Sequence, residues 1–596
     1  MTKEASGNRF LEDSHIFAGH PNPSWARRTW MSLDGIWTIT HRATKKEIRV
    51  PFPIGSKESG VDFKDSGLFV YEREFILNSF SMAKRYLLHI GACDYMTTVF
   101  VNAHLVGSHI GGYASFSFDI TSAAKPGKNR IEIRVRDSHS PFQVRGKQTF
   151  MRNAFFVWYE GIAGIWQSVW LEEVGLRYLE RAETNFDFSG QKLAVSVFLK
   201  LLDNKGEHIP DSSLRLRITV KSSDGRGKQA IRLLEAHNGV FKATFGFDEF
   251  NAALWSIETP NLHPMALTLL CGNTVFDNVE TYFGLREISA GKDGFKINGK
   301  PVFLKMVLNQ GYYPGGVYTP LDYSRMVEDI RTIKALGYNG ARIHEKVEAP
   351  YFHYLCDRLG LLTSFEMPSF YLPSKKGFRR YESELKELIL RDSMHPSCIM
   401  RMLFNETWGI WGIYRKSSAT RSFVEKMYRL AKHMDPTRPL IENSGWEHFM
   451  TDIVDFHHYL RNASLARNLY SKIRDGDEHT LEGFSLRRVL EFYVKNQVPF
   501  ATRSVFLEKP SNADVVPLFL SEYGGFGWYD TENKNAVEES IEEYTRDIVD
   551  SRLFCGYCYT QLYDVGSEVN GLMTFERNPK VDIERVRKAN NWEKEQ

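Results

Sequence analysis

The sequence predicts a three-domain protein in which two antiparallel β-sandwiches precede a (β/α)8 barrel. Three observations carry this prediction. The chain has 596 residues, which is too many for one hydrophobic core. Apolar and polar residues alternate with the two-residue period of β-strands as far as about residue 284. From residue 285 onward, apolar runs alternate with segments of helical periodicity.

Short alternating runs separated by Gly, Pro, Asn and Asp fill residues 1–180. In IEIRVRD, Ile131, Ile133 and Val135 share one face, as in a half-buried antiparallel strand. TTVFVNAHLVG and SFSFDIT alternate in the same way. Because such strands need a second layer to bury their apolar face, we expect a β-sandwich over residues 1–180.

The alternation continues over residues 181–284, in LAVSVFL and LRLRITV, with the turn-rich SSDGRGK following the second run. A segment of this length suits a second sandwich of immunoglobulin size.

The period changes after FGLREI, and residues 285–596 are predicted to form the barrel. In LDYSRMVEDIRTIKALG, Met326, Ile330 and Ile333 lie on one helical face before Gly337 ends the helix. Eight apolar runs follow one another, with helix-compatible sequence between most of them: VFLKMVL, YNGARI, LLTSFEM, CIMRMLF, PLIENS, DIVDFHHY, VPLFLSEY and CGYCYTQL. Eight strand–helix units are typical of a (β/α)8 barrel.

Composition and charge narrow the class of partner. Lys plus Arg number 76 against 73 for Asp plus Glu, without a long basic run, so neither nucleic acid nor an acidic membrane is an expected partner. No segment approaches eighteen apolar residues, and the first residues do not resemble a signal peptide, so a cytoplasmic protein is expected. The oligomeric state stays open, a homo-oligomer included.

The 6 cysteines are too few for a disulfide framework in a chain of this length. Cys555 and Cys558 have CxxC spacing, but they lie in FCGYCYTQL, which has the composition of a buried strand. Residues i and i+3 of a strand point to opposite faces, so this pair is not expected to bind a metal or to perform redox chemistry.

Two glutamates stand where a barrel places its active site, at the carboxyl ends of the strands. The fourth apolar run ends in Asn405 and Glu406, and the seventh ends in Ser521 and Glu522. A carboxylate on each side of a sugar C1 suits glycoside hydrolysis, since one donates a proton to the leaving oxygen while the other attacks the anomeric carbon. A single glutamate at a strand end is often only solvated or salt-bridged, so the prediction depends on the pair.

Around these glutamates, an ordered set of motifs resembles glycoside hydrolase family 2 over nearly the whole chain. The motifs are SLDGIWT, GIWQSVWLE, LWSIETPNL, FGLREI, INGKPVFLKMV, CDRLGLL, FNE, SEYGG and EVNGLMTFERNPK. The resemblance implies a jelly-roll sugar-binding sandwich, an immunoglobulin-like sandwich and a catalytic barrel. It also implies a retaining double displacement, in which Glu522 is the nucleophile and Glu406 the acid/base.

The resemblance implies roles for further residues. Asn405 matches the residue that hydrogen-bonds the sugar 2-hydroxyl, and Tyr459 matches the tyrosine that hydrogen-bonds the nucleophile. Trp446 matches a pocket-lining residue and Arg342 an arginine that braces the nucleophile region, although packing and a structural salt bridge are the alternatives. His344 is a candidate sugar ligand, displaced by one position from the histidine of many members.

Three departures bear on cofactor and substrate. We interpret Glu366 as a supporting residue. The segment MPSFYLPS after it has neither the carboxylate nor the histidine that hold magnesium in large β-galactosidases, so no metal and no cofactor is expected. Tyr559 stands where many members have a tryptophan beneath the sugar. Glu568 and Asn570 replace the Asn-x-Lys pair with which glucuronidases of the family bind the sugar carboxylate.

The predicted activity is therefore that of a retaining exo-β-glycosidase acting on a carbohydrate substrate, with neutral β-galactosides preferred over β-glucuronides. A β-glucuronidase or another β-glycosidase of the family is the alternative. A catalytically inactive carbohydrate-binding protein is the alternative of another class, and retention of Asn405, Glu406 and Glu522 argues against it. Transglycosylation needs the same residues and stays open.

Overall fold

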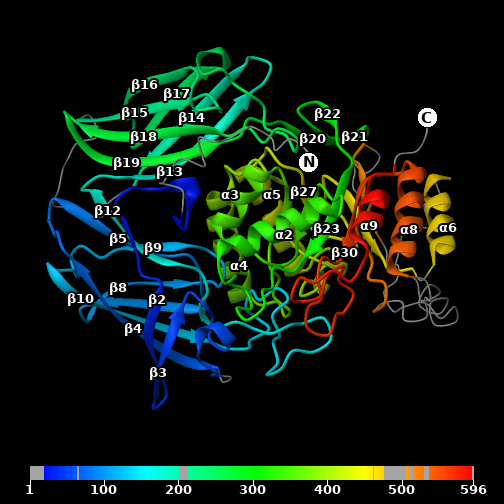
Figure 1. Ribbon diagram of the computed structural model, residues 1–596, viewed down its shortest axis with the longest axis horizontal. Helices are drawn as coiled ribbons and strands as arrows, with labels where there is room; N and C mark the ends of the chain where they lie inside the picture. Colours follow the sequence, from blue (N-terminus) through cyan, green and yellow to red (C-terminus); the bar gives the residue numbers. More distant parts are fainter. Residues whose placement is uncertain are drawn as a thin grey trace.

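The computed structural model describes residues 19–63, 66–200, 213–460, 462–475, 505–509, 515–528 and 536–592. Two β-sandwiches lie on one side of a barrel of strands and helices (Figure 1). The predicted fold class is thereby confirmed.

The N-terminal sandwich has a six-stranded and a four-stranded antiparallel sheet. The first is ordered β3 (Thr44–Val50), β2 (Gly35–His41), β4 (Gly67–Leu77), β10 (Gly127–Asp137), β7 (Met96–Val101) and β8 (His104–Ile110). The second is ordered β1 (Trp30–Ser32), β12 (Val169–Gly175), β5 (Lys84–Ile90) and β9 (Phe116–Asp119). Ile131, Ile133 and Val135 are all buried between the layers, as their alternation predicts.

Smaller elements complete this body. Strands β6 (Cys93–Asp94) and β11 (Gly164–Ile165) form a two-stranded sheet, and short 3-10 helices are η1 (Pro23–Trp25) and η2 (Lys57–Ser59).

The second sandwich packs two antiparallel sheets around Val195, Val197, Leu216 and Ile218. One sheet is ordered β13 (Leu179–Asp187), β14 (Lys192–Leu199) and β17 (Val240–Gly246). The other is ordered β16 (Gln229–Glu235), β15 (Leu214–Lys221), β18 (His263–Cys271) and β19 (Thr274–Phe283), and η4 (Phe247–Glu249) follows β17. A three-stranded sheet of β20 (Ile288–Gly291), β21 (Gly294–Ile297) and β22 (Lys300–Pro301) leads into the barrel.

The barrel is a sheet of eight parallel strands, and the eight predicted apolar runs are its strands. They are β23 (Leu304–Asn309), β24 (Gly340–Ile343), β25 (Leu362–Glu366), β26 (Cys398–Met402), β27 (Leu440–Ile441), β28 (Val454–His458), β29 (Leu518–Gly524) and β30 (Phe554–Thr560). The sheet is ordered β27-β26-β25-β24-β23-β30-β29-β28, so it closes except between β27 and β28. Cys555 and Cys558 are buried on β30, as the strand prediction requires.

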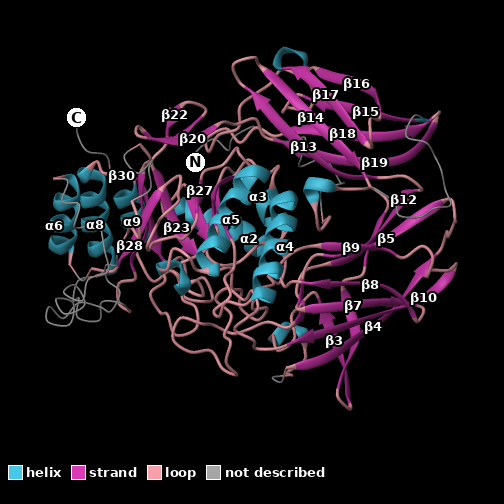
Figure 2. Cartoon of the chain, turned by 180° about the vertical axis from the view of Figure 1, so that it is seen from behind, coloured by secondary structure: helices cyan, strands magenta, loops and turns pink. Residues whose placement is uncertain are grey.

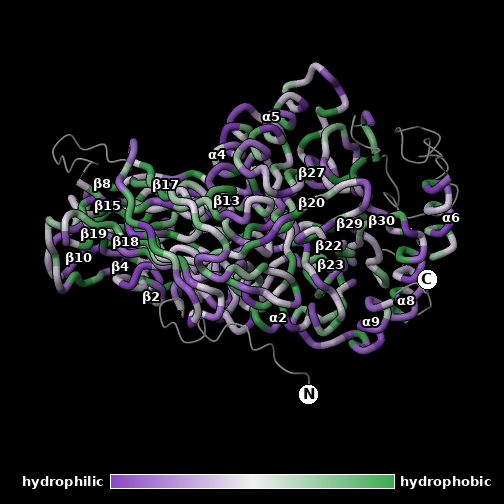
Figure 3. The backbone as a smooth tube through the Cα atoms, turned by 90° about the horizontal axis from the view of Figure 1, so that it is seen from above, coloured by the Kyte–Doolittle hydropathy of each residue, from purple (hydrophilic) through white to green (hydrophobic). Residues whose placement is uncertain are grey.

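Helices surround this sheet (Figure 2). They are α2 (Tyr323–Ala335), α3 (Pro350–Leu359), α4 (Lys375–Asp392), α5 (Ala419–Met434), α6 (Ala463–Arg474), α8 (Val537–Ser551) and α9 (Ile583–Asn590), with the 3-10 helix η5 (Trp411–Tyr414) before α5. Met326, Ile330 and Ile333 bury the predicted face of α2. Hydrophilic and hydrophobic residues are interspersed along the tube in Figure 3, and no helix in the described ranges is long and apolar enough to cross a membrane.

A long connection from the N-terminal sandwich reaches the barrel. It joins β10 to β11 and contacts the loop that follows β25, where the backbone N–H groups of Arg145 and Gly146 donate to the Ser369 carbonyl at 2.9 and 3.0 Å. Figure 1 shows this cyan segment passing along the barrel. Residues of the first sandwich are therefore available at the carboxyl ends of the barrel strands.

Candidate active site

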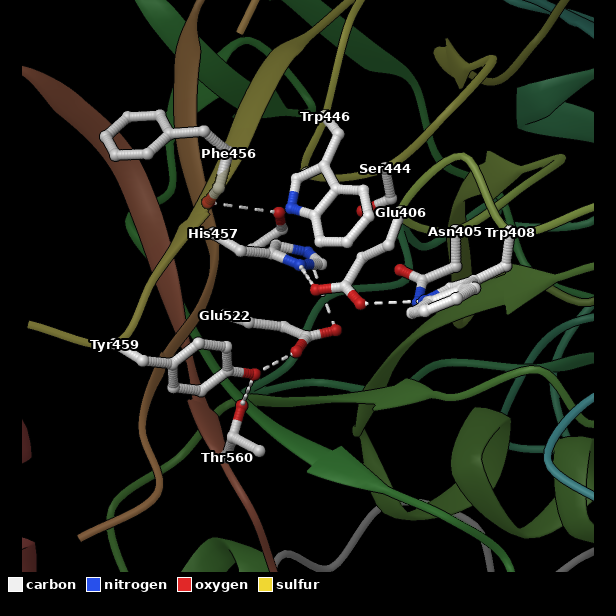
Figure 4. Close-up of polar contacts among 12 residues, drawn as sticks. Asn405, Glu406, Trp408, Ser444, Trp446, Phe456, His457, Tyr459, Glu522 and Thr560 are labelled. Carbon is white, nitrogen blue, oxygen red and sulfur yellow. Dashed lines mark hydrogen bonds and ion pairs between the residues drawn. The ribbon is translucent and has the colours of Figure 1, made fainter. Parts of the chain in front are cut away.

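Glu406 follows β26 on a backbone of unusual conformation. Glu406 and Thr407 have φ values of 50° and 60°, in the left-handed region that side chains other than glycine rarely adopt. Two hydrogen bonds hold this turn: Glu406 N–H donates to the Ser444 carbonyl at 2.9 Å, and Thr407 N–H donates to Asn443 Oδ1 at 2.9 Å. The turn directs the Glu406 side chain toward the barrel axis, as Figure 4 shows.

The Glu406 carboxylate has two side-chain partners (Figure 4). His457 Nδ1 lies 2.8 Å from its Oε1, and Trp408 Nε1 donates to its Oε2 at 3.1 Å. Burial raises the pKa of Glu406, but these hydrogen bonds outweigh burial and hold the pKa below its usual value. The unliganded site therefore favours the carboxylate form of Glu406.

Glu522, on β29, faces Glu406 across the barrel mouth. Tyr459 donates its hydroxyl to Glu522 Oε2, and Arg342 Nη1 donates to Oε1 at 2.8 Å. Glu522 is 4% exposed. One carboxylate oxygen of Glu406, one of Glu522 and a ring nitrogen of His457 all lie within 4.8 Å of one another. The structure thus brings the two predicted carboxylates together.

Arg342, at the end of β24, is the fully buried cation beneath this pair. Besides Glu522, it donates from Nε to Glu366 Oε2 and from Nη2 to Asn405 Oδ1, each at 2.8 Å. Burial opposes its charge, but the two carboxylates raise the pKa of Arg342 above its usual value. Burial raises the pKa of Glu366 despite Arg342. Arg342 therefore holds one oxygen of Glu522, the residue that the resemblance implies as the nucleophile.

Asn405 and His344 also lie in this group. Arg342 occupies the Asn405 oxygen, and within the described residues its Nδ2 makes no hydrogen bond, so Nδ2 is left to donate to a substrate hydroxyl. His344 Nδ1 lies 3.0 Å from Gln310 Oε1, and its Nε2 lies 3.9 Å from Glu522 Oε1. Burial, reinforced by the charge of Arg342, lowers the pKa of His344 well below its usual value, so the ring is neutral.

Trp446 is buried beside Glu406 and His457, as Figure 4 shows, and its ring centroid lies 6.0 Å from that of Trp408. This position agrees with the expected pocket lining.

The predicted position of Tyr559 is wrong. Its ring packs against Tyr523 and Phe526, at centroid distances of 5.7 and 6.1 Å, and so lies away from the carboxylates. Successive residues of a strand point to opposite faces, and the next residue, Thr560, is the one that faces the site, with Oγ1 3.5 Å from the Tyr459 hydroxyl. Thr560, rather than Tyr559, therefore faces the carboxylates.

Glu568 and Asn570 are committed to contacts within the protein. Glu568 Oε2 accepts a hydrogen bond from the Tyr159 hydroxyl, contributed by the N-terminal sandwich. Asn570 Oδ1 accepts from Gln561 Nε2 at 2.8 Å, and Gln561 in turn accepts from Gln310 at 2.8 Å. One oxygen of each residue is thus already hydrogen-bonded, whereas Asn570 Nδ2 is buried without a hydrogen-bond partner in the described residues.

His457, Trp408 and Thr560 are site residues that the sequence interpretation did not include. A signal existed for His457, because it stands two residues before Tyr459 and residues i and i+2 of a strand share a face. Trp408 lies in the turn after Glu406, where strand periodicity no longer applies.

The three ligand atoms of Glu406, His457 and Glu522 have the composition of a metal site. Arg342 donates to Glu522 Oε1 at 2.8 Å and lies 3.2 Å from His457 Nε2. A guanidinium on two of the three groups repels a second cation, so the cluster fits a metal ion poorly. As two carboxylates flanking a small space, it fits a sugar C1.

In comparison with known protein families, three parts of the chain match three domain descriptions of one family. Residues 29–174 match the family description "Glycosyl hydrolases family 2, sugar binding domain", residues 178–286 match "Glycosyl hydrolases family 2", and residues 288–524 match "Glycosyl hydrolases family 2, TIM barrel domain".

Individual relatives carry two different names. A beta-galactosidase of Thermoanaerobacter pseudethanolicus is 26% identical over 62% of this chain and 47% of its own length. A beta-glucuronidase of Bacteroides fragilis is 24% identical over 90% of this chain and 76% of its own length. The chain spans less than half the length of the first three curated relatives that it matches, between 35% and 47%.

Among solved structures, the FMN-binding beta-glucuronidase from Facaelibacterium prausnitzii L2-6 superimposes with a TM-score of 0.71 at 19% identity, over 95% of this chain and 86% of that one. At this identity the likeness describes the fold alone.

Proposed function

The chain belongs to glycoside hydrolase family 2, and from this premise we propose that it is a retaining exo-β-glycosidase with Glu522 as nucleophile and Glu406 as acid/base. The observation that carries the proposal is the spacing of the pair, whose oxygens approach within 4.8 Å. Retaining glycosidases hold their carboxyl groups about 5–5.5 Å apart, whereas inverting enzymes need about 6.5–9.5 Å to admit a water. Glu522 is buried and the Glu406 side chain is 19% exposed, which favours a pocket for one terminal sugar over an open groove.

In the first step, Glu522 attacks C1 as the leaving oxygen takes a proton from Glu406. Arg342 and Tyr459 orient the Glu522 carboxylate by occupying one oxygen each. Substrate binding removes water from Glu406 and so raises its pKa toward the acid form that this step needs. In the second step, Glu406 takes a proton from water, which attacks C1 and releases Glu522.

Asn405 and His457 assist the charge changes. The free Nδ2 of Asn405 is placed to donate to the sugar 2-hydroxyl, a bond that strengthens as positive charge develops at C1. His457 donates to Glu406 once Glu406 has lost its proton, and so stabilises the form that activates water.

The identity of the sugar that is removed is a separate question from the mechanism. The replacement of Asn-x-Lys by Glu568 and Asn570 predicts β-galactosidase activity, while the names of the relatives include both beta-galactosidase and beta-glucuronidase. Since Glu568 and Asn570 hydrogen-bond within the protein, these two residues do not decide between the activities. An inactive carbohydrate-binding protein would not need the paired contacts on Glu522 and Glu406, so the hydrolase is the better proposal.

Trapping the glycosyl-enzyme tests the proposal. The protein is incubated with 2-deoxy-2-fluoro β-glycosyl fluorides of the gluco, galacto and uronic acid series. A reagent with the correct sugar should add one fluorosugar to the protein, and peptide mass spectrometry should locate it on Glu522. Glu522→Ala should abolish labelling and lower turnover of aryl β-glycosides by several orders of magnitude while the protein remains folded. An inverted first-formed product by NMR, or near wild-type turnover by Glu522→Ala, contradicts it.

A further inference from the structure

Lys147 reaches the barrel mouth from the N-terminal sandwich. It lies in the connection between β10 and β11, and its carbonyl accepts a hydrogen bond from Tyr159 N–H at 2.8 Å. The preceding Gly146, at φ +57°, packs so closely on the loop after β24 that a Cβ there would lie 2.1 Å from the Glu345 carbonyl oxygen. The main chain at Lys147 is therefore fixed against the carboxyl ends of β24 and β25.

The Lys147 side chain is mostly buried in the described part of the chain, but its ammonium keeps some contact with solvent. The residue is 9% exposed, its Nζ lies 5.3 Å from the Tyr159 ring centroid, and it has neither a hydrogen bond nor an ion pair there. Lys346, also buried at the barrel mouth, instead donates to the Gly311 and Tyr318 carbonyls and to Glu348 Oε1, at 2.5, 3.1 and 2.8 Å. An accessible ammonium that has no hydrogen bond or ion pair within the described residues is available to bind an anion.

The charge of Lys147 acts on the catalytic pocket. Burial has the largest effect on the pKa of Glu406, Glu345 and His344. The positive charge of Lys147 lowers the pKa of each of the three. An anion bound by this ammonium would therefore lie within electrostatic reach of Glu406.

The carboxylates of the pocket have donors other than Lys147. Arg342 serves Glu366 and Glu522. His457 and Trp408 serve Glu406. The Tyr159 hydroxyl serves Glu568. Glu345 is the exception, because its Oε1 has no hydrogen-bond partner among the described residues and its pKa is lowered by the charge of Lys147. Lys147 nevertheless makes no ion pair with Glu345 or with the other carboxylates in the described residues.

We propose that Lys147 binds a carboxylate of the substrate sugar, and that the sugar cleaved from the non-reducing end is therefore a uronic acid. The inference rests on the proposed function, which it makes more specific. It opposes the preference for neutral galactosides predicted from Glu568 and Asn570. The segment after β30 lacks the lysine with which glucuronidases of the family bind the sugar carboxylate. Lys147 of the N-terminal sandwich supplies this positive charge instead, so the barrel sequence alone does not reveal it.

The test compares substrates that share one leaving group and differ only at C6. 4-Methylumbelliferyl β-glycosides carrying a carboxylate, an uncharged carboxamide or a hydroxymethyl group are assayed in the gluco and galacto series. In at least one series, wild-type kcat/KM should be higher for the acid than for both neutral analogues by about 30-fold or more, the loss typical of unpairing a buried charge. Raising the salt concentration should reduce that ratio.

Substitution assigns the effect to the residue. Lys147→Met should lower the acid-to-neutral ratio of kcat/KM by about 30-fold or more, and Lys147→Arg should retain a larger ratio than Lys147→Met. Lys128→Met is the matched control, because Lys128 is an exposed lysine of the same sandwich, and it should leave the ratio unchanged. Titration calorimetry of the free uronic acid and the neutral sugar into Glu522→Gln supplies a readout without turnover.

Three outcomes overturn the inference. Wild-type enzyme that cleaves the neutral glycoside at least as well as the acid in both series refutes it without reference to any variant. A ratio within about 3-fold of wild type in folded Lys147→Met assigns recognition to another residue. Cleavage of neutral glycosides with no preference for the acid, together with labelling of Glu522, would preserve the proposed function while removing this inference, whereas no cleavage and no labelling in any series removes both.

Discussion

His457 Nδ1 lies 2.8 Å from Oε1 of Glu406 and so carries the acid/base on the side that faces the nucleophile. Its other nitrogen, Nε2, lies 3.2 Å from Arg342 Nη1 and 3.5 Å from Glu522 Oε1. A guanidinium can only donate, so Nε2 accepts and Nδ1 carries the proton. His457 thus donates to Glu406 from Nδ1 and lies between Glu406 and Glu522, the two proposed catalytic carboxylates.

Replacing His457 should alter the pH profile as well as the rate. The hydrogen bond from His457 lowers the pKa of Glu406, so His457→Ala should raise that pKa. Because the first step needs protonated Glu406, activity is lost as pH rises through this pKa, and a higher pKa moves the basic limb of kcat/KM to higher pH. We expect a shift of about one unit and a fall in kcat of about 10- to 100-fold.

His458 provides the control for this variant. It is equally buried but lies on the other face of β28, with Nε2 2.7 Å from the Tyr470 hydroxyl. His458→Gln should leave the basic limb at the wild-type pH, whatever it does to stability. Equal shifts in both variants, or no shift in His457→Ala, would mean that His457 has only a structural role.

Trp408 acts on the other oxygen of Glu406, and Trp408→Phe keeps an aromatic ring while removing the Nε1 donor. The lost hydrogen bond should raise the pKa of Glu406 and move the basic limb to higher pH by less than His457→Ala does, since the Trp408 bond lowers the pKa less. Trp411, whose ring centroid lies 5.4 Å from that of Trp408, is the control. A Trp411→Phe profile that shifts as far as that of Trp408→Phe would contradict the assignment.

Strand periodicity was sufficient to predict the barrel, because each buried parallel strand is a short apolar run and most of the eight runs are separated by amphipathic helices. The same periodicity placed Glu406 and Glu522 at strand ends. It could not place Tyr559, because assigning a side chain to a face requires an alignment correct to one residue, and an error of one moves it to the opposite face. Thr560 is the residue that faces the site.

The Lys147 position could not be predicted for a different reason. No periodicity links the connection between β10 and β11 to the barrel, since their contact depends on how two domains dock. The hydrogen bonds of Arg145 and Gly146 to Ser369 fix that docking, and they use backbone groups that leave no signature in the sequence. The contact of Glu568 with Tyr159 was not predictable for the same reason, because Tyr159 lies in the other domain.

Docking between the two sandwiches should depend on Arg27. Its Nη1 lies 2.6 Å from Glu172 of β12 and its Nε lies 2.9 Å from Asp277 of β19, with all three side chains buried. Arg27→Met leaves two buried carboxylates without their cation, which costs about 3–5 kcal/mol. Thermal or denaturant unfolding followed by tryptophan fluorescence should show a clear loss of stability.

Arg28→Met is the control for that measurement. Arg28 also pairs with a glutamate of the second sandwich, Glu280 at 2.7 Å, but its side chain is 68% exposed. Exposed pairs contribute about 0–1 kcal/mol, so Arg28→Met should unfold close to wild type. Comparable losses in the two variants would show that burial of the Arg27 cluster does not determine its contribution.

Removing the acid/base should affect substrates according to their leaving groups. Glu406→Ala cannot protonate the leaving oxygen, so the glycosylation step should slow by orders of magnitude for alkyl or sugar leaving groups and far less for dinitrophenolate, which departs without a proton. With dinitrophenyl glycosides the second step then limits turnover, because no base activates water. Azide needs no base, so it should accelerate turnover and yield a β-glycosyl azide, whose configuration reports attack on a covalent intermediate at Glu522.

Glu366→Gln is the contrasting variant. Glu366 contacts Arg342 rather than Glu406, so its loss should slow the cleavage of substrates with good and with poor leaving groups alike and should give no azide product. Equal slowing of both leaving-group classes in Glu406→Ala, together with no response to azide, would remove Glu406 from the acid/base role.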